Sequence, residues 1–456
     1  MIGGVPKALA LRLGWTSTTF AIMQLLRLIN SVVLARLLAP PVFGLMMIVN
    51  TIRTGAELLS DVGINQNIVS SKQGENPVFY DTAWTLQVLR GVILGMLCIL
   101  FAGAFADFFE ASELAVILPI FALLFIFSGF QSIGRALLQK RVAVVRAGLF
   151  ELAVLLFTVV LQIILALITP TIWALVIGSI ASGAATLIAS YFLIPGLRHR
   201  FLIEPNSAHQ ILHFSKWIFL SSIIYFLAMN FDRLYFAKQI SLADLGVFAI
   251  ARSLADMISS AAVRSGNLLV FPTVAAMVGP NHQIRGRLLR GRRTVLLLVA
   301  LGLGAFVAVA DVVVEVLYDA RYAEAAILLP LLLLGVWFAV LATVNASILL
   351  GTARPALPAL SNGAKLLSYV IFVPLAFYYY GLIAAIMVLN AGEVVRYLVL
   401  WMFTRKQHLA FGRDDLALTI IFLFCILVFR QLLSAGGLTG SLDQLFPWVS
   451  AMAAKI

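Results

Sequence analysis

Long uninterrupted runs of apolar residues are the feature that most constrains this chain. Each run is long enough to cross a bilayer, which takes about 20 residues in a helix. They are continuous and do not alternate in the short pattern of a membrane barrel, so they predict helices. The predicted spans are 13–38, 43–69, 83–106, 114–138, 147–168, 171–195, 215–239, 244–275, 294–318, 325–351, 356–379, 382–404 and 416–435. We expect an all-α polytopic membrane protein with about 12 to 14 transmembrane helices.

The amino-acid composition is typical of an integral membrane protein. Hydrophobic residues make up 62% of the 456 residues and charged residues only 11%, which excludes an ordinary soluble domain. The net charge of +12 could indicate nucleic acid, but the basic residues lie in short loops between apolar runs. We therefore expect the lipid bilayer as a partner and no nucleic acid. Cys98 and Cys425 lie inside apolar runs and indicate neither a disulfide framework nor a metal site.

The loops also predict an orientation. Basic residues concentrate in alternate connections, whereas the opposite loops hold only Arg36, Lys238 and Arg321. By the positive-inside rule the N-terminus is predicted to be cytoplasmic, in a multi-pass protein of the bacterial inner (plasma) membrane. Lys7 and Arg12 precede the first apolar run as in a signal peptide, but Arg27 interrupts that run, so we interpret it as an uncleaved span.

The two halves of the chain repeat. A shift of 202 positions places Trp15 on Trp217, Gly44 on Gly246 and Asn65 on Asn267 without a gap. Copies that are six spans apart start on the same membrane side, which predicts two pseudo-symmetric six-helix lobes around a central cavity. The predicted parts are an N-terminal lobe at 1–200, a cytoplasmic linker at 201–212, a C-terminal lobe at 213–404 and extra C-terminal spans at 405–456. Whether 442–456 forms a full span stays open.

Several predicted spans carry charges at bilayer depth. Such charges are costly in lipid, so they usually face a water-filled cavity or pair within the bundle. Cations outnumber carboxylates in this interior set, which favours an anionic substrate such as a diphosphate. The candidate substrate-binding residues are Arg27, Asn30, Arg53, Arg252, Arg264 and Lys365, and the candidate ion-coupling residues are Glu57, Asp61, Asp232 and Asp256.

Each of these assignments has a structural alternative. Arg53 with Glu57, and Arg252 with Asp256, are four residues apart and can simply neutralise one another on a helix. Arg27 and Lys365 have no such helical partner, which favours the cavity for both. Other cations, Arg90 and Arg135 among them, can reach the membrane interface from positions near the ends of spans.

Absent motifs narrow the function further. The chain has no GxxxxGK[ST] loop, so we expect no nucleotide chemistry and no cofactor. Its five histidines fall in predicted cytoplasmic connections without Glu or Cys at ligand spacing, and we interpret them as surface residues and expect no metal. The predicted outer loops are short, which disfavours a membrane-embedded sugar transferase and any other enzyme.

Several stretches of the chain form a recognisable set. They are LARLLAPPVFGLMMI (34–48), ELLSDVGINQNIV (57–69), NFDRLYFAKQISLADLGVFAIARSLADM (230–257), FPTVAAM (271–277), VLYDARYAEAAILLPLL (316–332) and ILLGTARP (348–355). Together they resemble the polysaccharide transporter family of oligosaccharide flippases, which belongs to the multidrug, oligosaccharidyl-lipid and polysaccharide exporter superfamily. Asp319 departs from the family pattern, in which a glycine is common there.

The resemblance implies a two-lobed bundle with a cationic cavity that flips undecaprenyl-diphosphate-linked oligosaccharide repeat units to the periplasmic leaflet. The product would enter exopolysaccharide, capsule or O-antigen, with a polysaccharide polymerase and assembly proteins as further partners. An exporter of small compounds on the same fold is the alternative. The sugar composition, the coupling ion and the oligomeric state stay open.

Overall fold

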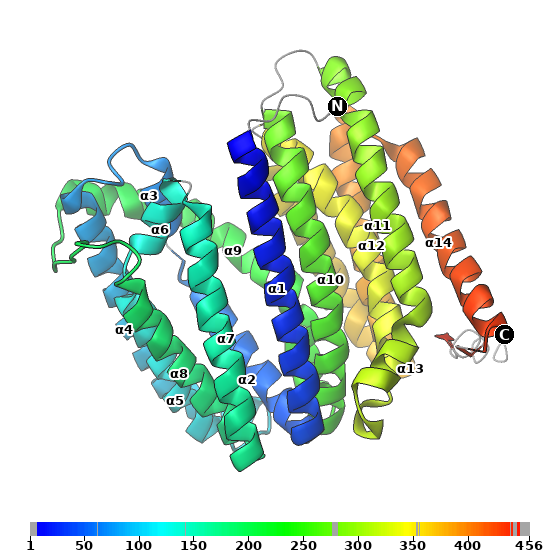
Figure 1. Cartoon of the computed structure of the whole chain (residues 1–456), viewed down its shortest axis with the longest axis horizontal. Coiled ribbons are helices and arrows are strands. Elements are labelled where there is room, and N and C mark those ends of the chain that lie inside the picture. Colours follow the sequence, from blue (N-terminus) through cyan, green and yellow to red (C-terminus); the bar gives the residue numbers. More distant parts are fainter. Residues whose placement is uncertain are drawn as a thin grey trace. The chain divides into compact units, whose positions relative to one another are not determined.

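The regular elements of the computed structural model are helices (Figure 1), and the all-α prediction is confirmed. The structure describes residues 7–61, 63–141, 143–275, 281–352, 354, 356–437, 439–440 and 445–446. The chain divides into two compact units. The first contains Met1–Phe226 and Arg233–Gly246, and the second contains Leu227–Asp232 and Val247–Ile456. The predicted lobe limits at 200 and 213 stay a prediction.

The first unit is built from α1 to α8 and parts of α9 and α10. Its helices are α1 (Lys7–Leu37), α2 (Pro40–Leu59), α3 (Ile64–Ser70), α4 (Pro77–Phe108), α5 (Leu114–Phe130), α6 (Gly134–Lys140), α7 (Val144–Ile168) and α8 (Ile172–Ser190). Within this unit α5 packs against both α4 and α8, and α1 packs against α7.

Local sequence explains several helix starts. Pro40, Pro77 and Pro205 stand at the first position of their helices, where a missing N–H costs nothing and the fixed φ suits a helix. At the start of α4 the Asn76 side chain also accepts a hydrogen bond of 3.0 Å from the Val78 amide. This bond satisfies one of the free N–H groups that every helix start leaves.

Two predicted spans are broken in the structure. The stretch 43–69 becomes α2 and α3, because Gly63 adopts a left-handed conformation with φ 65° between them. The stretch 114–138 becomes α5 and α6, which are bent by 50°. Each break is only a few residues long and has apolar residues on both sides, so the hydropathy pattern alone ran each pair together.

The second unit contains the remaining helices. They are α9 (Pro205–Gln239) and α10 (Leu242–Ala275), both shared with the first unit, then α11 (Asn281–Leu317), the 3-10 turn η1 (Ala320–Tyr322), α12 (Ala325–Gly351), α13 (Ala356–Lys406) and α14 (Gly412–Ala435). α12 packs against α11 and α13, and α14 packs against α11.

α13 is a hairpin of two helices. Gly381 has φ 78° and ψ −166° inside its 51 residues, a conformation open to glycine alone among common residues. A straight helix of that length would span roughly 75 Å, far beyond a hydrocarbon core of about 30 Å. Across the break, the Tyr369 hydroxyl donates to the Leu389 carbonyl at 2.9 Å. The halves therefore fold back on each other, in agreement with the predicted spans 356–379 and 382–404.

The surface is that of a membrane protein. Among the described residues, nine helices are long and apolar enough to cross a bilayer, with α5 and α6 as one further bent span. α13 counts once among the nine although it holds two helices. Leu100 and Ile168 are 74% and 73% exposed. Such surfaces favour lipid as their surroundings, and the chain is a multi-pass membrane protein.

The internal repeat is visible in one contact within the first unit. Gly44 on α2 and Gly246 on α10, which the repeat superimposes, lie at the same helix crossing. A Cβ atom at Gly44 would collide with the Leu242 carbonyl oxygen and lie 3.1 Å from the Gly246 nitrogen. A Cβ atom at Gly246 would collide with the Pro40 carbonyl oxygen. Only glycine permits this approach of two backbones.

Candidate functional site

In the first unit, α2 carries two of the predicted site residues, and a third follows its end. Arg53 lies 3.5 Å from Glu57 one turn later, and their side chains are 37% and 35% exposed. This pairing is the geometry that the structural alternative predicted, but both groups stay accessible. Asp61 follows the end of α2, where its carboxylate accepts a 2.9 Å hydrogen bond from the Gly63 amide. That bond holds the turn between α2 and α3.

The two predicted residues on α1 are in different situations. Arg27 is exposed, and its guanidinium donates to the Gln24 side chain at 3.2 Å. Asn30 donates to the Gln162 side chain at 3.0 Å, which ties α1 to α7. Its amide oxygen is buried and has no hydrogen-bond partner. Their hydrogen bonds lead to Gln24 and Gln162 and not to Arg53, so Arg27, Asn30 and Arg53 do not form one hydrogen-bonded group.

In the second unit, three predicted residues come together. Arg252 on α10 lies 3.1 Å from Asp232 on α9 and 3.2 Å from Asp256 one turn along its own helix. The exposed fractions of the side chains are 4% for Asp232, 22% for Arg252 and 40% for Asp256. A single guanidinium thus bridges a buried carboxylate and an accessible one. The link to Asp232 joins two helices, which the sequence spacing did not reveal.

Lys365 is buried in a second charged group. Its ammonium lies 2.5 Å from Glu393, which also lies 3.3 Å from Arg396. Lys365 has no such partner one turn away, as the sequence indicated, but the α13 hairpin brings Glu393 close from 28 positions away. The Lys365 ammonium also lies 5.2 Å from the centre of the Tyr369 ring.

The two charged groups of the second unit are neighbours. Arg252 is close enough to Tyr369 and Glu393 to interact with both electrostatically. Phe231 precedes Asp232 on α9, and its ring lies 6.0 Å from the ring of Tyr369 on α13. The backbone of Arg264 belongs to α10, but its side chain lies outside the described part of the chain, so its predicted role stays a prediction.

Further buried pairs join α11 to α14. Arg430 is 1% exposed and binds Asp311 through two hydrogen bonds of 2.8 and 2.7 Å. Arg292 lies 2.6 Å from Asp415, and both side chains are almost fully buried. These pairs hold two helices together and leave little surface for a ligand.

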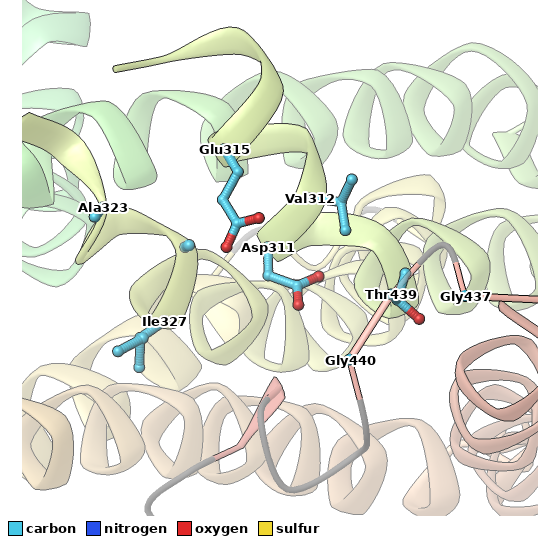
Figure 2. A pocket seen from close by; sticks show the side chains of 9 residues that line it. Asp311, Val312, Glu315, Ala323, Ile327, Gly437, Thr439 and Gly440 are labelled. Carbon is cyan, nitrogen blue, oxygen red and sulfur yellow. The ribbon is translucent and has the colours of Figure 1, made fainter. Parts of the chain in front are cut away.

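Asp311 also borders a polar cavity of about 460 Å³ in the second unit. Figure 2 shows the carboxylates of Asp311 and Glu315 extending from α11, with Thr439 and Gly440 nearby. Because Arg430 already neutralises Asp311, the cavity offers one free acidic side chain in the part of the chain that the structure describes. Among the described residues, no group of three or more His, Cys, Asp or Glu could hold a metal ion.

The prediction of surface histidines was wrong for His199. Its side chain is 1% exposed, its ring stacks on Trp84 at 5.3 Å, and its Nε2 lies 2.9 Å from the Ser132 hydroxyl. Burial lowers the pKa of His199, and the nearby Asp81 carboxylate opposes this shift. The segment after His199 is held against α4, where the Leu202 amide donates to Thr85 at 3.0 Å.

Comparison with known proteins identifies the family. Residues 33–327, well over half of the chain, match the family model described as polysaccharide biosynthesis protein. The chain belongs to the polysaccharide biosynthesis protein family. The resemblance of the sequence to polysaccharide transporters is thereby confirmed.

Curated relatives of this polysaccharide biosynthesis protein agree with the family. The lipopolysaccharide biosynthesis protein WzxC of Escherichia coli (strain K12) is 26% identical over 247 residues, which cover 53% of this chain and 49% of that one. The succinoglycan biosynthesis transport protein ExoT of Rhizobium meliloti (strain 1021) is 21% identical over 330 residues, which cover 72% of this chain and 66% of that one. The matches thus span about half of WzxC and about two thirds of ExoT.

Solved structures of the same fold match this chain over nearly its whole length. The lipid II flippase MurJ, in an inward closed conformation, has a TM-score of 0.74 at 12% identity and covers 93% of this chain and 99% of its own. An inward-facing multidrug resistance MATE family transporter has a TM-score of 0.66 at 15% identity, covering 87% and 95%. At such identities they show the fold alone. The family match and the transport protein among the curated relatives support a membrane transporter rather than an enzyme, as the sequence predicted.

The sequence analysis did not identify Arg90 as a residue that joins two helices of this family member. Arg90 was interpreted as a residue near the end of a span that reaches for the interface. Its guanidinium instead donates to the Ser60 hydroxyl at 2.9 Å and to the Glu57 carbonyl at 2.5 Å, both on α2. Its position in the middle of an apolar span, without an acidic residue three or four positions away, was the available signal.

Proposed function

We propose that this chain is a flippase that moves undecaprenyl-diphosphate-linked oligosaccharide repeat units from the cytoplasmic to the periplasmic leaflet by alternating access. The product would serve the synthesis of exopolysaccharide, capsule or O-antigen. The family match over residues 33–327 carries this proposal. The names of WzxC and ExoT, which refer to lipopolysaccharide and succinoglycan biosynthesis, support it.

The charged groups inside the helices would serve this function in two ways. Half-exposed Arg53 has donors that a diphosphate can use, because guanidinium binds phosphate oxygens in a fork geometry. Arg252 is held between two carboxylates, of which Asp256 is the accessible one. Asp256 would exchange the coupling ion, while buried Asp232 would orient Arg252. Arg27, Asn30, Arg264 and Lys365 complete the proposed cavity set, and Glu57 and Asp61 complete the coupling set.

The membrane arrangement belongs to the same proposal. The N-terminus would lie in the cytoplasm of a bacterial inner membrane, as the basic loops predict. Lobes at 1–200 and 213–404, joined by the linker 201–212 and followed by 405–456, would rock about the cavity. A polysaccharide polymerase and assembly proteins would receive the flipped unit.

The test is a deletion in the source cell, complemented with variants. Surface polysaccharide and the leaflet that holds lipid-linked repeat units are measured together with membrane abundance. We expect deletion to abolish one polymer and to leave intermediates on the cytoplasmic face. Arg53→Gln should restore abundance but not export. Arg141→Gln is the matched control, because Arg141 is an ion-paired arginine of similar exposure that lies outside the spans, 3.0 Å from Glu75.

One result would overturn the flippase proposal, and another would overturn the role of Arg53 in it. Intact polymer in the deletion strain, with reduced tolerance of toxic compounds, would make the protein an exporter of small molecules. Loss of folded protein in Arg53→Gln, with normal export per remaining molecule, would make the Arg53–Glu57 pair a purely structural contact.

A further inference from the structure

The first unit contains an apolar trough that no predicted site residue lines. It lies between α2, α4, α5 and α9, and all its lining residues belong to the first unit. Its volume of about 460 Å³ is within the range of roughly 300 to 1,000 Å³ that is typical of ligand pockets. Aromatic rings dominate the walls: Phe101, Phe105, Phe109, Phe125 and Phe226.

The trough has a firm floor and an open side. Phe226 is 5% exposed and its ring faces Gly55, where a Cβ atom would lie only 2.7 Å from the ring. Phe125 is equally buried on α5. On the open side, Leu97 and Phe101 of α4 are about half exposed. A ligand can therefore enter sideways along α4 without unpacking the core of the unit.

A polar group closes one end of the trough. Ser60, the C-cap of α2, is part of the lining, and its hydroxyl accepts a hydrogen bond from Arg90 at 2.9 Å. Arg90 also donates to the backbone carbonyl of Glu57, which is likewise uncharged. Among the described residues no ion pair includes Arg90, although the carboxylates of Glu57 and Asp61 are close enough to interact with it electrostatically. Its direct hydrogen bonds go to uncharged oxygens, so the guanidinium lies at the end of an apolar trough with no carboxylate bonded to it.

An apolar trough that ends at a guanidinium matches an amphiphile with one apolar chain and an anionic head. A guanidinium has five N–H donors, and Arg90 uses two of its nitrogens on α2, which leaves donors for a phosphate. A single trough suits one chain better than the paired chains of a phospholipid. Methyl-branched, unsaturated chains also pack well against aromatic rings, which supply large apolar area.

We propose that this trough binds the polyisoprenyl chain of the substrate, with Arg90 on its phosphate. The inference rests on the proposed function and adds to it a lipid subsite in the first unit, in which Arg90 is a second donor to the diphosphate that Arg53 would also bind. The chain would stay in contact with the protein at the membrane side of α4 while the polar part crosses.

The experiment uses the full chain in nanodiscs of phosphatidylethanolamine and phosphatidylglycerol. The probe is undecaprenyl diphosphate with a photoreactive diazirine on one of the isoprene units next to the diphosphate, and labelled peptides are mapped. We expect label in 52–60 and 94–109. Leu97→Trp, at the rim, should lower labelling about tenfold, because excluding roughly two methylene groups weakens binding by that factor. Ala56→Phe, inside the trough, should act in the same direction.

Leu100→Trp is the matched control. Leu100 is on α4 three residues further along, is 74% exposed and does not line the trough, so labelling should not change. Thermal unfolding of all three variants shows whether they are folded. Arg90→Gln should weaken labelling by the diphosphate probe more than Arg90→Lys, which keeps the charge.

The outcomes separate the trough from the proposed function. Saturable label elsewhere in the chain would overturn the assignment of the trough as the lipid subsite and leave the flippase proposal in place. Absence of saturable binding anywhere would sink both. Equal competition by phosphatidylglycerol and by unlabelled undecaprenyl phosphate would show a general lipid-facing groove and overturn the assignment to a polyisoprenyl chain.

Discussion

Gly44 and Gly246 occupy equivalent positions in the repeat and meet at one crossing of α2 with α10. The contact is reciprocal: Gly44 faces Leu242, four residues before Gly246, and Gly246 faces Pro40, four residues before Gly44. Such reciprocity is the mark of a two-fold relation between copies, here two segments of one chain. The repeat read from the sequence thus has a structural counterpart within the first unit.

This crossing should not tolerate a side chain. Gly44→Ala and Gly246→Ala each drive a methyl group into a backbone carbonyl, so we expect each to cost about 1–3 kcal/mol of unfolding free energy. The double variant should cost less than the sum, because one separation of the helices accommodates both methyl groups. Thermal unfolding in detergent measures this. Gly103→Ala, with no atom near its added methyl group, should be neutral or stabilising, and an equal loss there would contradict the argument.

In the charged group of the α13 hairpin, loss of the carboxylate should destabilise the protein more than loss of the lysine. Removal of one partner from a buried ion pair typically costs about 3–5 kcal/mol. Lys365→Met leaves Glu393 with Arg396 as a partner, whereas Glu393→Gln leaves both Lys365 and Arg396 without their carboxylate. We therefore expect Glu393→Gln to lower the melting temperature more than Lys365→Met. The reverse order would argue against the shared carboxylate.

The pair Arg430–Asp311 should matter for folding rather than transport. Arg430→Gln removes a bidentate, buried contact between α11 and α14, and about 3–5 kcal/mol of stability should be lost with a fall in membrane abundance. Arg321→Gln breaks a half-exposed pair with Asp319 and should change stability by less than about 1 kcal/mol. Abundance measured by immunoblot compares the two. Normal abundance of Arg430→Gln with impaired export would point to a transport role instead.

His199 should make stability depend on pH. Burial lowers the pKa of His199 below its ordinary value of 6.5, so the unfolded chain takes up a proton more readily than the folded one. The stability that the buried, neutral His199 contributes is fully present above about pH 6.5. It is lost as the pH falls below that value toward the pKa of His199 in the folded state. The melting temperature between pH 7.5 and pH 5 should therefore fall toward acid.

The matching variant is His199→Phe, which keeps a ring against Trp84 and removes the titrating group. It should flatten the pH dependence of the melting temperature. His209→Phe, at an exposed position, should leave the dependence as it is in the unchanged protein. A profile for His199→Phe that falls as steeply as before would show that other groups control acid stability.

Much of the fold could be predicted because each membrane helix forms its backbone hydrogen bonds within itself and can be recognised from its local apolar composition. Continuous apolar runs therefore located most helices, including the two halves of α13. The breaks at Gly63 and between α5 and α6 escaped, because they depend on backbone conformation and not on hydropathy. The orientation and the lobe limits remain predictions.

The candidate site followed a different rule. Pairs on one helix, such as Arg53 with Glu57, were visible in the sequence, since residues four apart always meet on a helix. The bonds of Arg252 to Asp232, and of Arg90 to α2, join separate helices.

The sequence by itself determined that this is an all-helical membrane protein of a polysaccharide family, because hydropathy and loop motifs are local properties of the chain. Only the tertiary structure decided which buried charges are partners, that His199 is inside, and that an apolar trough ends at Arg90. Those features depend on which helices pack side by side, and chain separations of 28 or more residues carry no local signal of that.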